Sequence, residues 1–314
     1  MLIGYTVKNN TLEKTVVNLR ADLVPEMVWL DAVNPTEQER QWTREVYGQE
    51  LLFAEELGEI EASARFYRDE QGLHLHLYFL LAGEGFARNV NVAYSLHQNR
   101  LFSLRTDELP EFRSFVTKAR RDSGLYGSPA AILVGMIATR TESMADLFEK
   151  LQGELETLSA SVFRANDRTV RSIFNALAAI EDTNSKARLG LLENRRAYAL
   201  LIKTPEAAAH VADLTEIMLD IDSIVGYANF LVDRTKFLMD AAIGISNIAQ
   251  ARRLNIFTVL SVVLMPPTLI ASIYGMNFEH MPELKWLLGY PMALILMVVV
   301  AVGPIMYLRK KGML

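Results

Sequence analysis

The sequence predicts an α+β membrane protein: an N-terminal α/β domain, a helical hairpin, and a very long stalk helix that continues into the first of two C-terminal transmembrane helices. The main observation is a pair of apolar runs, Asn255–Ile273 and Leu287–Leu308, neither of which contains Asp, Glu, Lys or Arg. A helix of about 20 apolar residues crosses the hydrocarbon core of a bilayer. In addition, period-two patterns are confined to the N-terminal part, whereas long helical patterns follow Pro129. A buried helical hairpin in a soluble core is the alternative, which charge-free runs of this length disfavour.

The bulk composition agrees with this division and excludes several classes of function. Of 314 residues, 51% are apolar and 22% are charged, as expected when two apolar helices are averaged with a charged soluble part. The net charge of −5 argues against nucleic acid as a partner, because phosphate neutralisation requires a basic surface. Cysteine is absent, which excludes disulfides, thiolate nucleophiles and cysteine-ligated metals. Met1–Asn10 lacks the apolar run of a signal peptide, so we expect the part before the apolar runs to stay in the cytosol.

Basic residues beside the apolar runs predict the orientation in the membrane. Arg252 and Arg253 precede the first run and Arg309-Lys310-Lys311 follows the second, whereas the turn between the runs contains only Lys285. Lys and Arg bias a flank toward the cytoplasm. Both termini are therefore expected on the cytoplasmic side, with the turn outside.

The N-terminal part alternates strand and helix patterns. Strands are expected at Met27–Asp31, Leu73–Phe79, Val90–Leu96 and Arg100–Arg105, with Gln98-Asn99 as a hairpin turn, and helices at Pro35–Arg40 and, with acidic character, Leu51–Ala64. His74 and His76 lie two residues apart on one strand, so they share one face. They could form half of a metal site, but no third ligand is evident nearby. A pair of partly buried or surface histidines is the simpler interpretation.

Long helices follow the α/β part. Two are expected first, at Ala130–Phe163 and Arg168–Ile202, separated at Asn166-Asp167. Thr204-Pro205-Glu206 is a helix start, with a capping Thr and Pro at the first helical position. A helix from Pro205 to Ile273 is roughly 100 Å long at 1.5 Å per residue, and such a rod cannot bury an apolar stripe alone, so we expect neighbouring helices and an oligomer. We divide the chain into an α/β domain (1–128), a helical hairpin (129–203), a stalk helix (204–253), transmembrane helix 1 (254–274), a loop (275–286), transmembrane helix 2 (287–308) and a basic tail (309–314).

Acidic residues on the stalk are candidates for cation binding. Nothing in the sequence suggests catalysis, because it has no nucleotide-binding glycine loop, nucleophile elbow or HExxH pattern. Asp213, Glu216 and Asp220 fall on one stripe of the stalk helix, and Asp240 lies further along it. Carboxylates gathered in this way suit hard ions such as Mg²⁺, although a solvated acidic face is the simpler interpretation.

The first apolar run has one face that could line a pore. Spacings of three and four residues bring together Leu254, Phe257, Ser261, Met265, Thr268 and Ser272. The same face could instead contact lipid or other helices, and the pattern leaves both alternatives open. Pro266-Pro267 removes two intrahelical hydrogen bonds, so a bend or pivot is expected there.

The turn between the two runs carries a family resemblance. Tyr274-Gly275-Met276-Asn277-Phe278, followed by Met281-Pro282-Glu283-Leu284, strongly resembles the signature of the CorA family of magnesium channels at their external mouth. Met265-Pro266-Pro267-Thr268, Gly289-Tyr290-Pro291 and the basic tail are also similar to that family, and Glu59–Phe66 resembles its enterobacterial branch. The resemblance covers essentially the whole chain and is strongest near the C-terminus.

The resemblance implies a homopentameric funnel in the bacterial inner membrane. Gly275, Met276 and Asn277 would form the selectivity filter, with five copies of Asn277 in a ring at the outer mouth and with Glu279 and Glu283 adding negative field. Gly275 would let the backbone turn tightly after the helix. The pore-lining positions would be Leu254, Phe257, Ser261, Met265 and Thr268, with the first two in a hydrophobic gate. The chain departs from many relatives at Ala251, Leu254 and Asn255, where they carry Asn, Met and Lys.

The resemblance also implies regulation by intracellular Mg²⁺ bound between subunits. The stalk carboxylate of the family's regulatory site falls at Glu216 and the domain-side carboxylate near Glu59, both of which replace aspartates of some relatives. Asp213 and Asp220 would belong to the same stripe, and Asp240 would form a second acidic ring in the pore. Bound Mg²⁺ would hold the subunits in a symmetric, closed arrangement, and depletion would restore carboxylate repulsion and widen the pore.

The sequence thus leads to a CorA-type Mg²⁺ channel. It is expected to have divalent cations, the lipid bilayer and further copies of itself as partners, and Co²⁺ and Ni²⁺ are further candidate ions. A zinc transporter of the ZntB type is one alternative; such proteins typically carry Gly-Val-Asn where this chain has Gly275-Met276-Asn277, so the methionine favours magnesium. A membrane-anchored sensor that binds divalent ions without conducting them is another, against which the Asn277 signature argues.

Overall fold

The computed structural model describes residues 1–9, 11–51, 65–81, 86–122, 124–163, 167–277 and 281–310. The chain divides into two compact units, Met1–Arg164 with Arg171–Asp240, and Ala165–Val170 with Ala241–Leu314. The helices are α1 (Glu37–Tyr47), α3 (Pro110–Arg121), α4 (Pro129–Val162), α5 (Asp167–Leu201), α6 (Val211–Tyr274) and α7 (Gly289–Lys310), with 3₁₀ segments η1 (Arg20–Asp22), η3 (Pro205–His210) and η4 (Pro282–Lys285). Thus α6 contributes residues to both units.

A seven-stranded mixed sheet forms part of the first unit, with strand order β2-β1-β3-β7-β6-β5-β4. The strands are β1 (Leu2–Lys8), β2 (Thr11–Val17), β3 (Met27–Val33), β4 (Phe66–Asp69), β5 (Gly72–Leu81), β6 (Arg88–His97) and β7 (Arg100–Arg105). Of the described pairs, β3 with β7 is parallel and the others are antiparallel. The four expected strands are confirmed as β3, β5, β6 and β7, whereas β1, β2 and β4 were not expected.

The hairpin between β6 and β7 confirms its expected turn. Gln98 and Asn99 have φ angles of 47° and 57°, and His97 pairs with Arg100 across the turn. Positive φ at both central residues is the requirement of the two-residue turn whose twist matches the flanking strands. Asn adopts this conformation more readily than most residues, which explains why the dipeptide ends one strand and starts the next.

Different helices cover the two faces of the sheet. On one face, Leu30 and Phe102 belong to a buried cluster with Tyr47 of α1. On the other face, the indole of Trp29 contacts the ring of Phe112 on α3. Adjacent strand residues point to opposite faces, so Trp29 and Leu30 serve two different cores. The helix expected at Pro35–Arg40 is confirmed as α1, and the one expected at Leu51–Ala64 lies almost entirely outside the described residues.

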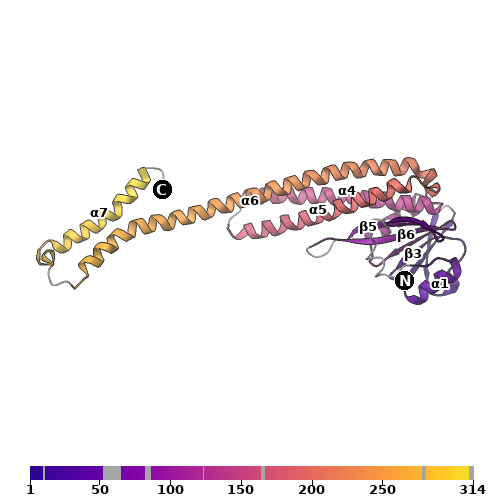
Figure 1. Ribbon diagram of the computed structural model, residues 1–314, viewed down its shortest axis with the longest axis horizontal. Helices are drawn as coiled ribbons and strands as arrows, with labels where there is room; N and C mark the ends of the chain where they lie inside the picture. Colours follow the sequence, from indigo (N-terminus) through magenta and orange to yellow (C-terminus); the bar gives the residue numbers. More distant parts are fainter. Residues whose placement is uncertain are drawn as a thin grey trace. The chain divides into compact units, whose positions relative to one another are not determined.

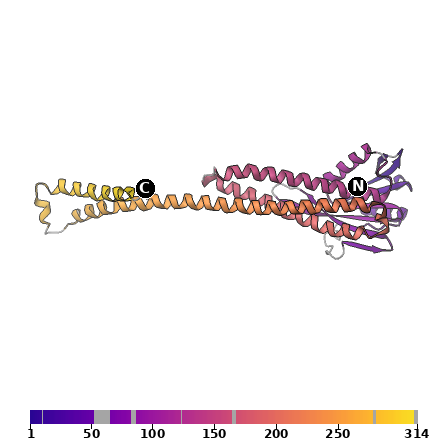
Figure 2. The same ribbon diagram turned by 90° about the horizontal axis from the view of Figure 1, so that it is seen from above.

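The expected helical hairpin is confirmed as α4 and α5, which lie beside the first part of α6 in both views (Figures 1 and 2). The side-chain amide of Asn184 on α5 donates to the carbonyl of Ala228 on α6 at 3.2 Å. Arg234 Nη1 on α6 lies 3.9 Å from Glu156 Oε1 on α4. Apolar residues of α6 fill the space between the helices, including the fully buried Leu214 and Ile221. The first part of α6 is therefore an ordinary amphipathic helix.

The expected helix start at Thr204 is partly wrong. Pro205 begins a helical segment, but this is the 3₁₀ turn η3, and α6 starts only at Val211. The hydroxyl of Thr204 does not cap the segment and instead donates to the carbonyl of Leu201 at 2.8 Å. That carbonyl belongs to the last turn of α5 and also accepts from the backbone amide of Thr204 at 3.0 Å, so Thr204 closes the end of α5 and does not cap the next helix.

The second unit contains the end of α6 and all of α7, which runs back alongside it (Figure 1). Both helices are long and apolar enough to cross a membrane, and almost none of their apolar stretches is buried within the chain. Helix α6 remains helical through Pro266 and Pro267 and ends at Tyr274, as expected for the first span. A helix that is apolar on all sides needs surroundings of hydrocarbon or other helices.

Candidate ion-conduction and regulatory sites

The face of α6 that was expected to line a pore is exposed along its length. Leu254, Phe257 and Met265 expose 58%, 67% and 69% of their surface, and Ser261 and Thr268 are exposed as well. Among the residues that the structure describes, none covers these side chains. The face is therefore available to line a pore, to pack on another helix or to contact lipid.

Two hydroxyl groups on this face each donate their proton to a carbonyl of their own helix. Ser261 Oγ donates to the carbonyl of Phe257 at 2.9 Å, and Thr268 Oγ1 donates to the carbonyl of Leu264 at 2.8 Å. Because each hydroxyl proton is used within the helix, the groups turn oxygen lone pairs outward. Pro266 and Pro267 have no N–H groups, so they leave the carbonyls of Val262 and Val263, which lie on other sides of the helix, without their usual helical partners. The bend expected at these prolines remains a prediction.

The glycine, methionine and asparagine of the expected filter lie directly after α6. The amide of Gly275 still donates to the carbonyl of Ala271 at 2.9 Å, that of Met276 donates to Ile273 at 3.2 Å, and Asn277 is exposed. The expected reason for Gly275 needs correction, because its φ is not among the positive ones. A Cβ at this position would lie 3.1 Å from the Ala271 carbonyl oxygen, to which the Gly275 amide already donates; this contact is tight but does not by itself require glycine.

Of the two acidic residues expected at the outer mouth, one can be placed. Glu283 lies in η4 and is partly exposed, and its carbonyl accepts from the amide of Trp286 at 3.2 Å. Glu279 lies outside the described residues. The negative field expected from this pair stays a prediction.

The acidic stripe on α6 faces away from the helical bundle. Asp213, Glu216 and Asp220 are exposed, while their neighbours Leu214 and Ile217 are buried. Asp213 Oδ2 lies 3.1 Å from Nδ1 of His210, the residue that ends η3. Asp240 is also exposed, and Glu59 lies outside the described residues. Within the described part of the chain, no three His, Asp or Glu side chains converge on a metal site.

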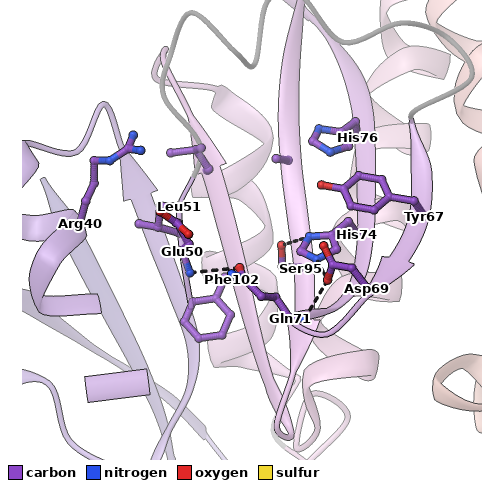
Figure 3. Close-up of a pocket in the computed structure, with 12 residues that line it drawn as sticks. Arg40, Glu50, Leu51, Tyr67, Asp69, Gln71, His74, His76, Ser95 and Phe102 are labelled. Carbon is purple, nitrogen blue, oxygen red and sulfur yellow. Dashed lines mark hydrogen bonds and ion pairs between the residues drawn. The ribbon is translucent and has the colours of Figure 1, made fainter. Parts of the chain in front are cut away.

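The two histidines of β5 line a cavity of about 240 Å³ between the sheet and α1 (Figure 3). His74 uses both ring nitrogens, with Nδ1 2.8 Å from Ser95 Oγ and Nε2 2.9 Å from Asp69 Oδ1. The ring of Tyr67 stacks on both imidazoles, with centroid distances of 4.6 Å to His74 and 5.9 Å to His76. The shared face is confirmed, but the histidines are more buried than expected and the interposed Tyr67 keeps them from converging on one ion.

His76 differs from His74 in having an unpartnered ring nitrogen. Its Nδ1 is buried without a hydrogen-bond partner, and only 2% of the residue is exposed. Burial, followed by the charges of His74 and Arg65, lowers the pKa of His76 to about 4. At neutral pH the imidazole is therefore uncharged, and it acts as part of the interior.

Two polar links in the first unit were not found from the sequence. Arg68 Nη2 on β4 donates to both carboxylate oxygens of Glu206 on η3, at 2.7 and 2.8 Å. Asn194 on α5 bonds both backbone groups of Tyr78 on β5, each at 2.9 Å. Asn194 is a polar residue at a core-facing position of an amphipathic helix, and this pattern could have marked it as a buried hydrogen-bonding residue. Nothing in the sequence indicates that its partner is Tyr78.

Comparisons with known proteins agree with one another. A family model described as "CorA-like Mg2+ transporter protein" matches residues 25–310. The magnesium transport protein CorA of Escherichia coli K12 is 39% identical over 317 residues, covering all of both chains. In three dimensions, the CorA magnesium transporter from Methanocaldococcus jannaschii matches with a TM-score of 0.79 at 17% identity, covering 99% of this chain and 98% of that one.

The zinc alternative receives less support from the same comparisons. The cytoplasmic domain of ZntB from Vibrio parahaemolyticus matches with a TM-score of 0.61 at 13% identity, covering 78% of this chain and 97% of that domain. Identity this low indicates a shared fold and carries no information on the ion. The full-length relatives at 39% identity are named as magnesium transport proteins, which are transporters and not enzymes.

Proposed function

Because the chain belongs to the CorA-like Mg²⁺ transporter family, we propose that it forms a homopentameric channel in the bacterial inner membrane through which Mg²⁺ enters the cytosol. The observation that carries the proposal is the end of α6, where a helix exposed on all its apolar sides leads directly into the exposed Gly275-Met276-Asn277. Five such helices around an axis would bury one face of each and bring five Asn277 side chains together. No single chain provides that ring.

A ring of carboxamides suits this ion for a physical reason. Mg²⁺ is small and gives up its bound water reluctantly. Neutral carboxamide oxygens of Asn277 accept hydrogen bonds from those waters, so they hold the hydrated ion without stripping or trapping it. Five carboxylates at the same point would risk binding too tightly for release. Glu279 and Glu283 would raise the local cation concentration, and Lys285 offsets part of their field.

The pore below the filter would combine an acceptor surface with a dry constriction. The outward lone pairs of Ser261 and Thr268 continue the interaction with the ion's waters, and Met265 lies between them. Leu254 and Phe257, both more than half exposed in one chain, would form an apolar ring that closes by excluding water. No ATP is needed, because moving two charges inward across 100 mV gains roughly 4.6 kcal/mol, twice the value for one charge.

Internal Mg²⁺ would regulate this channel through the acidic stripe of α6. Asp213, Glu216 and Asp220 are exposed in one chain, so they are available to a neighbouring subunit, whose Glu59 would complete the site. Asp240 would form a further acidic ring. Like charges brought together in this way repel unless a cation neutralises them. Bound Mg²⁺ would therefore favour the closed assembly, and its loss would favour opening.

The orientation follows from the basic flanks of the two membrane helices. Arg252 and Arg253 on α6 and Arg309 and Lys310 on α7 would lie on the cytoplasmic side, together with both termini and the α/β domain. The segment from residue 275 to residue 286 would face the periplasm. The stalk (204–253) would then connect the regulatory carboxylates to the pore within one helix.

The test is ion uptake into proteoliposomes that contain the purified full-length protein. Asn277→Ala should abolish or strongly reduce Mg²⁺ uptake, whereas Asn175→Ala, which truncates an exposed asparagine on α5, should leave it unchanged. Cross-linking in the same vesicles should give a ladder that ends at five subunits. Wild-type protein that carries no Mg²⁺, or an Asn277→Ala variant that transports normally, would refute the channel. Binding of divalent ions without uptake would favour the sensor alternative.

The same vesicles distinguish the candidate ions. Uptake of Zn²⁺ in preference to Mg²⁺ would support the ZntB-type alternative, and in that case Met276→Val should increase the preference. If the methionine does favour magnesium, Mg²⁺ competes with Co²⁺ and Ni²⁺ for entry and Zn²⁺ competes poorly. These measurements need only a change of the external ion.

A further inference from the structure

Strand β5 loses its neighbour before it ends. Strand β4 pairs with β5 from Asp69↔Gly72 to Phe66↔Leu75, and the ladder continues once more where the amide of His76 donates to the carbonyl of Arg65 at 2.8 Å. Because strand residues alternate, Tyr78 is the next residue whose backbone groups point to the same side. None of the described residues of β4 lies opposite them. A strand edge left in the interior would carry unpaired backbone groups at a high free-energy cost.

A side chain of α5 takes the place of the missing strand. The amide of Tyr78 donates to Asn194 Oδ1 at 2.9 Å, and Asn194 Nδ2 donates to the carbonyl of Tyr78 at 2.9 Å. Arg140 Nε on α4 donates to the same carbonyl at 2.6 Å, so both lone pairs of that oxygen are used. Asn194 is 1% exposed and Arg140 is also 1% exposed. The carboxamide therefore acts as one more backbone unit in the ladder, supplied by a helix.

Asn194 belongs to a polar stripe on α5 that faces the β5–β6 hairpin. One turn before it, Gly190 lies against the same two strands, and a Cβ there would be in ordinary van der Waals contact with Tyr78 Cβ and Asn89 Oδ1 at 3.4 Å. One turn earlier still, Lys186 Nζ donates to the carbonyl of Ala87 at 2.7 Å, and the carbonyl of Lys186 accepts from Asn89 Nδ2 at 2.8 Å. Residues four apart lie on the same face of a helix, so these contacts together attach one face of α5 to the β5–β6 hairpin.

The same helix is attached to α6 by its other faces. Asn184 donates to the carbonyl of Ala228, and Arg195 Nη2 lies 2.7 Å from Asp222 Oδ2. Hydrogen bonds fix position more sharply than apolar contacts, because a small slide breaks them. Helix α5 therefore cannot shift on the sheet without breaking bonds at Tyr78, and cannot shift on α6 without breaking bonds at Ala228 and Asp222. Asp222 lies two residues beyond the acidic stripe.

We propose that the polar stripe of α5 is the link that transmits the state of the α/β domain to α6, with Asn194 as its positioning residue. The inference rests on the proposed regulation by internal Mg²⁺. It predicts that loosening the attachment uncouples α6 from the sheet, so that higher internal Mg²⁺ is needed for closure. The filter and the pore wall are untouched, so the ranking of permeant ions does not change.

The experiment measures the internal Mg²⁺ concentration that halves uptake in proteoliposomes of the full-length protein. Asn194→Leu keeps the size of the side chain but removes both bonds to Tyr78, and it should raise this concentration by at least about threefold. The control is Thr43→Val, which removes a similarly buried hydrogen bond, from Thr43 Oγ1 to the carbonyl of Glu39, within α1. It should lower the melting temperature without changing the half-inhibiting concentration.

A second variant tests the proposal even if Asn194→Leu does not fold. Lys186→Met keeps the methylene chain of a partly exposed residue and removes the bond to Ala87, together with an ion pair to Asp182 within α5. It should fold and shift the half-inhibiting concentration in the same direction by a smaller factor. The proposal is overturned if wild type is inhibited by internal Mg²⁺ and both folded variants respond as wild type does. A wild type that ignores internal Mg²⁺ overturns the proposed regulation itself and this inference with it. A changed ion ranking would also overturn the inference.

Discussion

The buried ion pair between Asp31 and Arg105 offers a sharp test of how the α/β domain is held together. Arg105 Nη2 lies 2.9 Å from Asp31 Oδ2, and the two side chains expose 7% and 1% of their surface. Ser103 Oγ donates to Asp31 Oδ1 at 2.7 Å and accepts from Trp29 Nε1 at 2.9 Å. The group joins β3 to β7, the parallel pair at the centre of the sheet.

Asp31→Asn should be strongly destabilising, because it leaves the charge of Arg105 buried without a counterion. Breaking a buried pair in this way costs about 3–5 kcal/mol. For a domain of this size each kcal/mol lowers the melting temperature by roughly 2–4 °C, so the expected fall is roughly 6–20 °C. The assay is tryptophan fluorescence of the full-length protein in detergent during heating, at one fixed scan rate because unfolding of membrane proteins is seldom reversible.

Two comparisons decide whether the reasoning is correct. Glu108→Gln breaks an exposed pair with Arg113, whose N–O distance is 2.6 Å and whose side chains expose 60% and 76%, and it should cost less than about 1 kcal/mol. Asp31→Leu with Arg105→Met removes both buried charges and should recover most of the lost stability. The reasoning is refuted if Asp31→Asn costs no more than Glu108→Gln, or if the double variant is less stable than Asp31→Asn.

Further predictions concern pH, backbone geometry and regulation. Burial lowers the pKa of His76 from its ordinary value of 6.5 to about 4, so the unfolded chain binds the proton more tightly than the folded one. The free energy of unfolding should therefore fall by about 3 kcal/mol as the pH drops from the unfolded pKa to the folded pKa. His76→Leu should remove that part of the pH dependence in thermal melts, and an unchanged profile would contradict the assignment. Gly72→Ala should lower the melting temperature, because Gly72 has a φ of 116° and a Cβ would lie 2.2 Å from the carbonyl oxygen of Leu96; a melting temperature equal to that of wild type would contradict this. Glu216→Ala should raise the internal Mg²⁺ that half-inhibits uptake by at least about fivefold, and unchanged inhibition would point to other carboxylates.

The elements that could be predicted are those whose signal lies within one segment. Strands β5, β6 and β7 follow from alternation and from Gln98-Asn99, and helices α4 and α5 follow from long helical spacing. Strand β2 was missed because it is an edge strand, where Glu13 and Lys14 interrupt the apolar alternation and only Leu12 and Val17 are buried. Charged edges of this kind prevent association between sheets and hide the strand pattern at the same time.

The links that could not be predicted depend on register between distant segments. Asp31 and Arg105 meet because β3 and β7 pair in parallel with Asp31 opposite Ser103, and a shift of one residue would place them on opposite faces. Asn194 and Tyr78 lie 116 residues apart and meet because β4 ends before β5 does. The proposed filter is the opposite case. Asn277 is recognised from its motif, although the ring of five asparagines that would give it a role requires several chains.

The two parts of α6 show how one helix can serve two environments. Before Asp240 the helix buries one stripe, with Leu214, Ile221 and Leu238 fully covered by its own chain. After Arg253 the same backbone continues with apolar residues on every side and almost nothing covered. An isolated helix of this kind would be insoluble in water, so its surface needs hydrocarbon or other helices around it, which in the proposed channel are lipid and further copies of the chain. The face with Ser261 and Thr268 turns oxygen lone pairs outward, and hydrocarbon offers them no donor. That asymmetry favours placing this face on the water-filled axis, directly below Asn277.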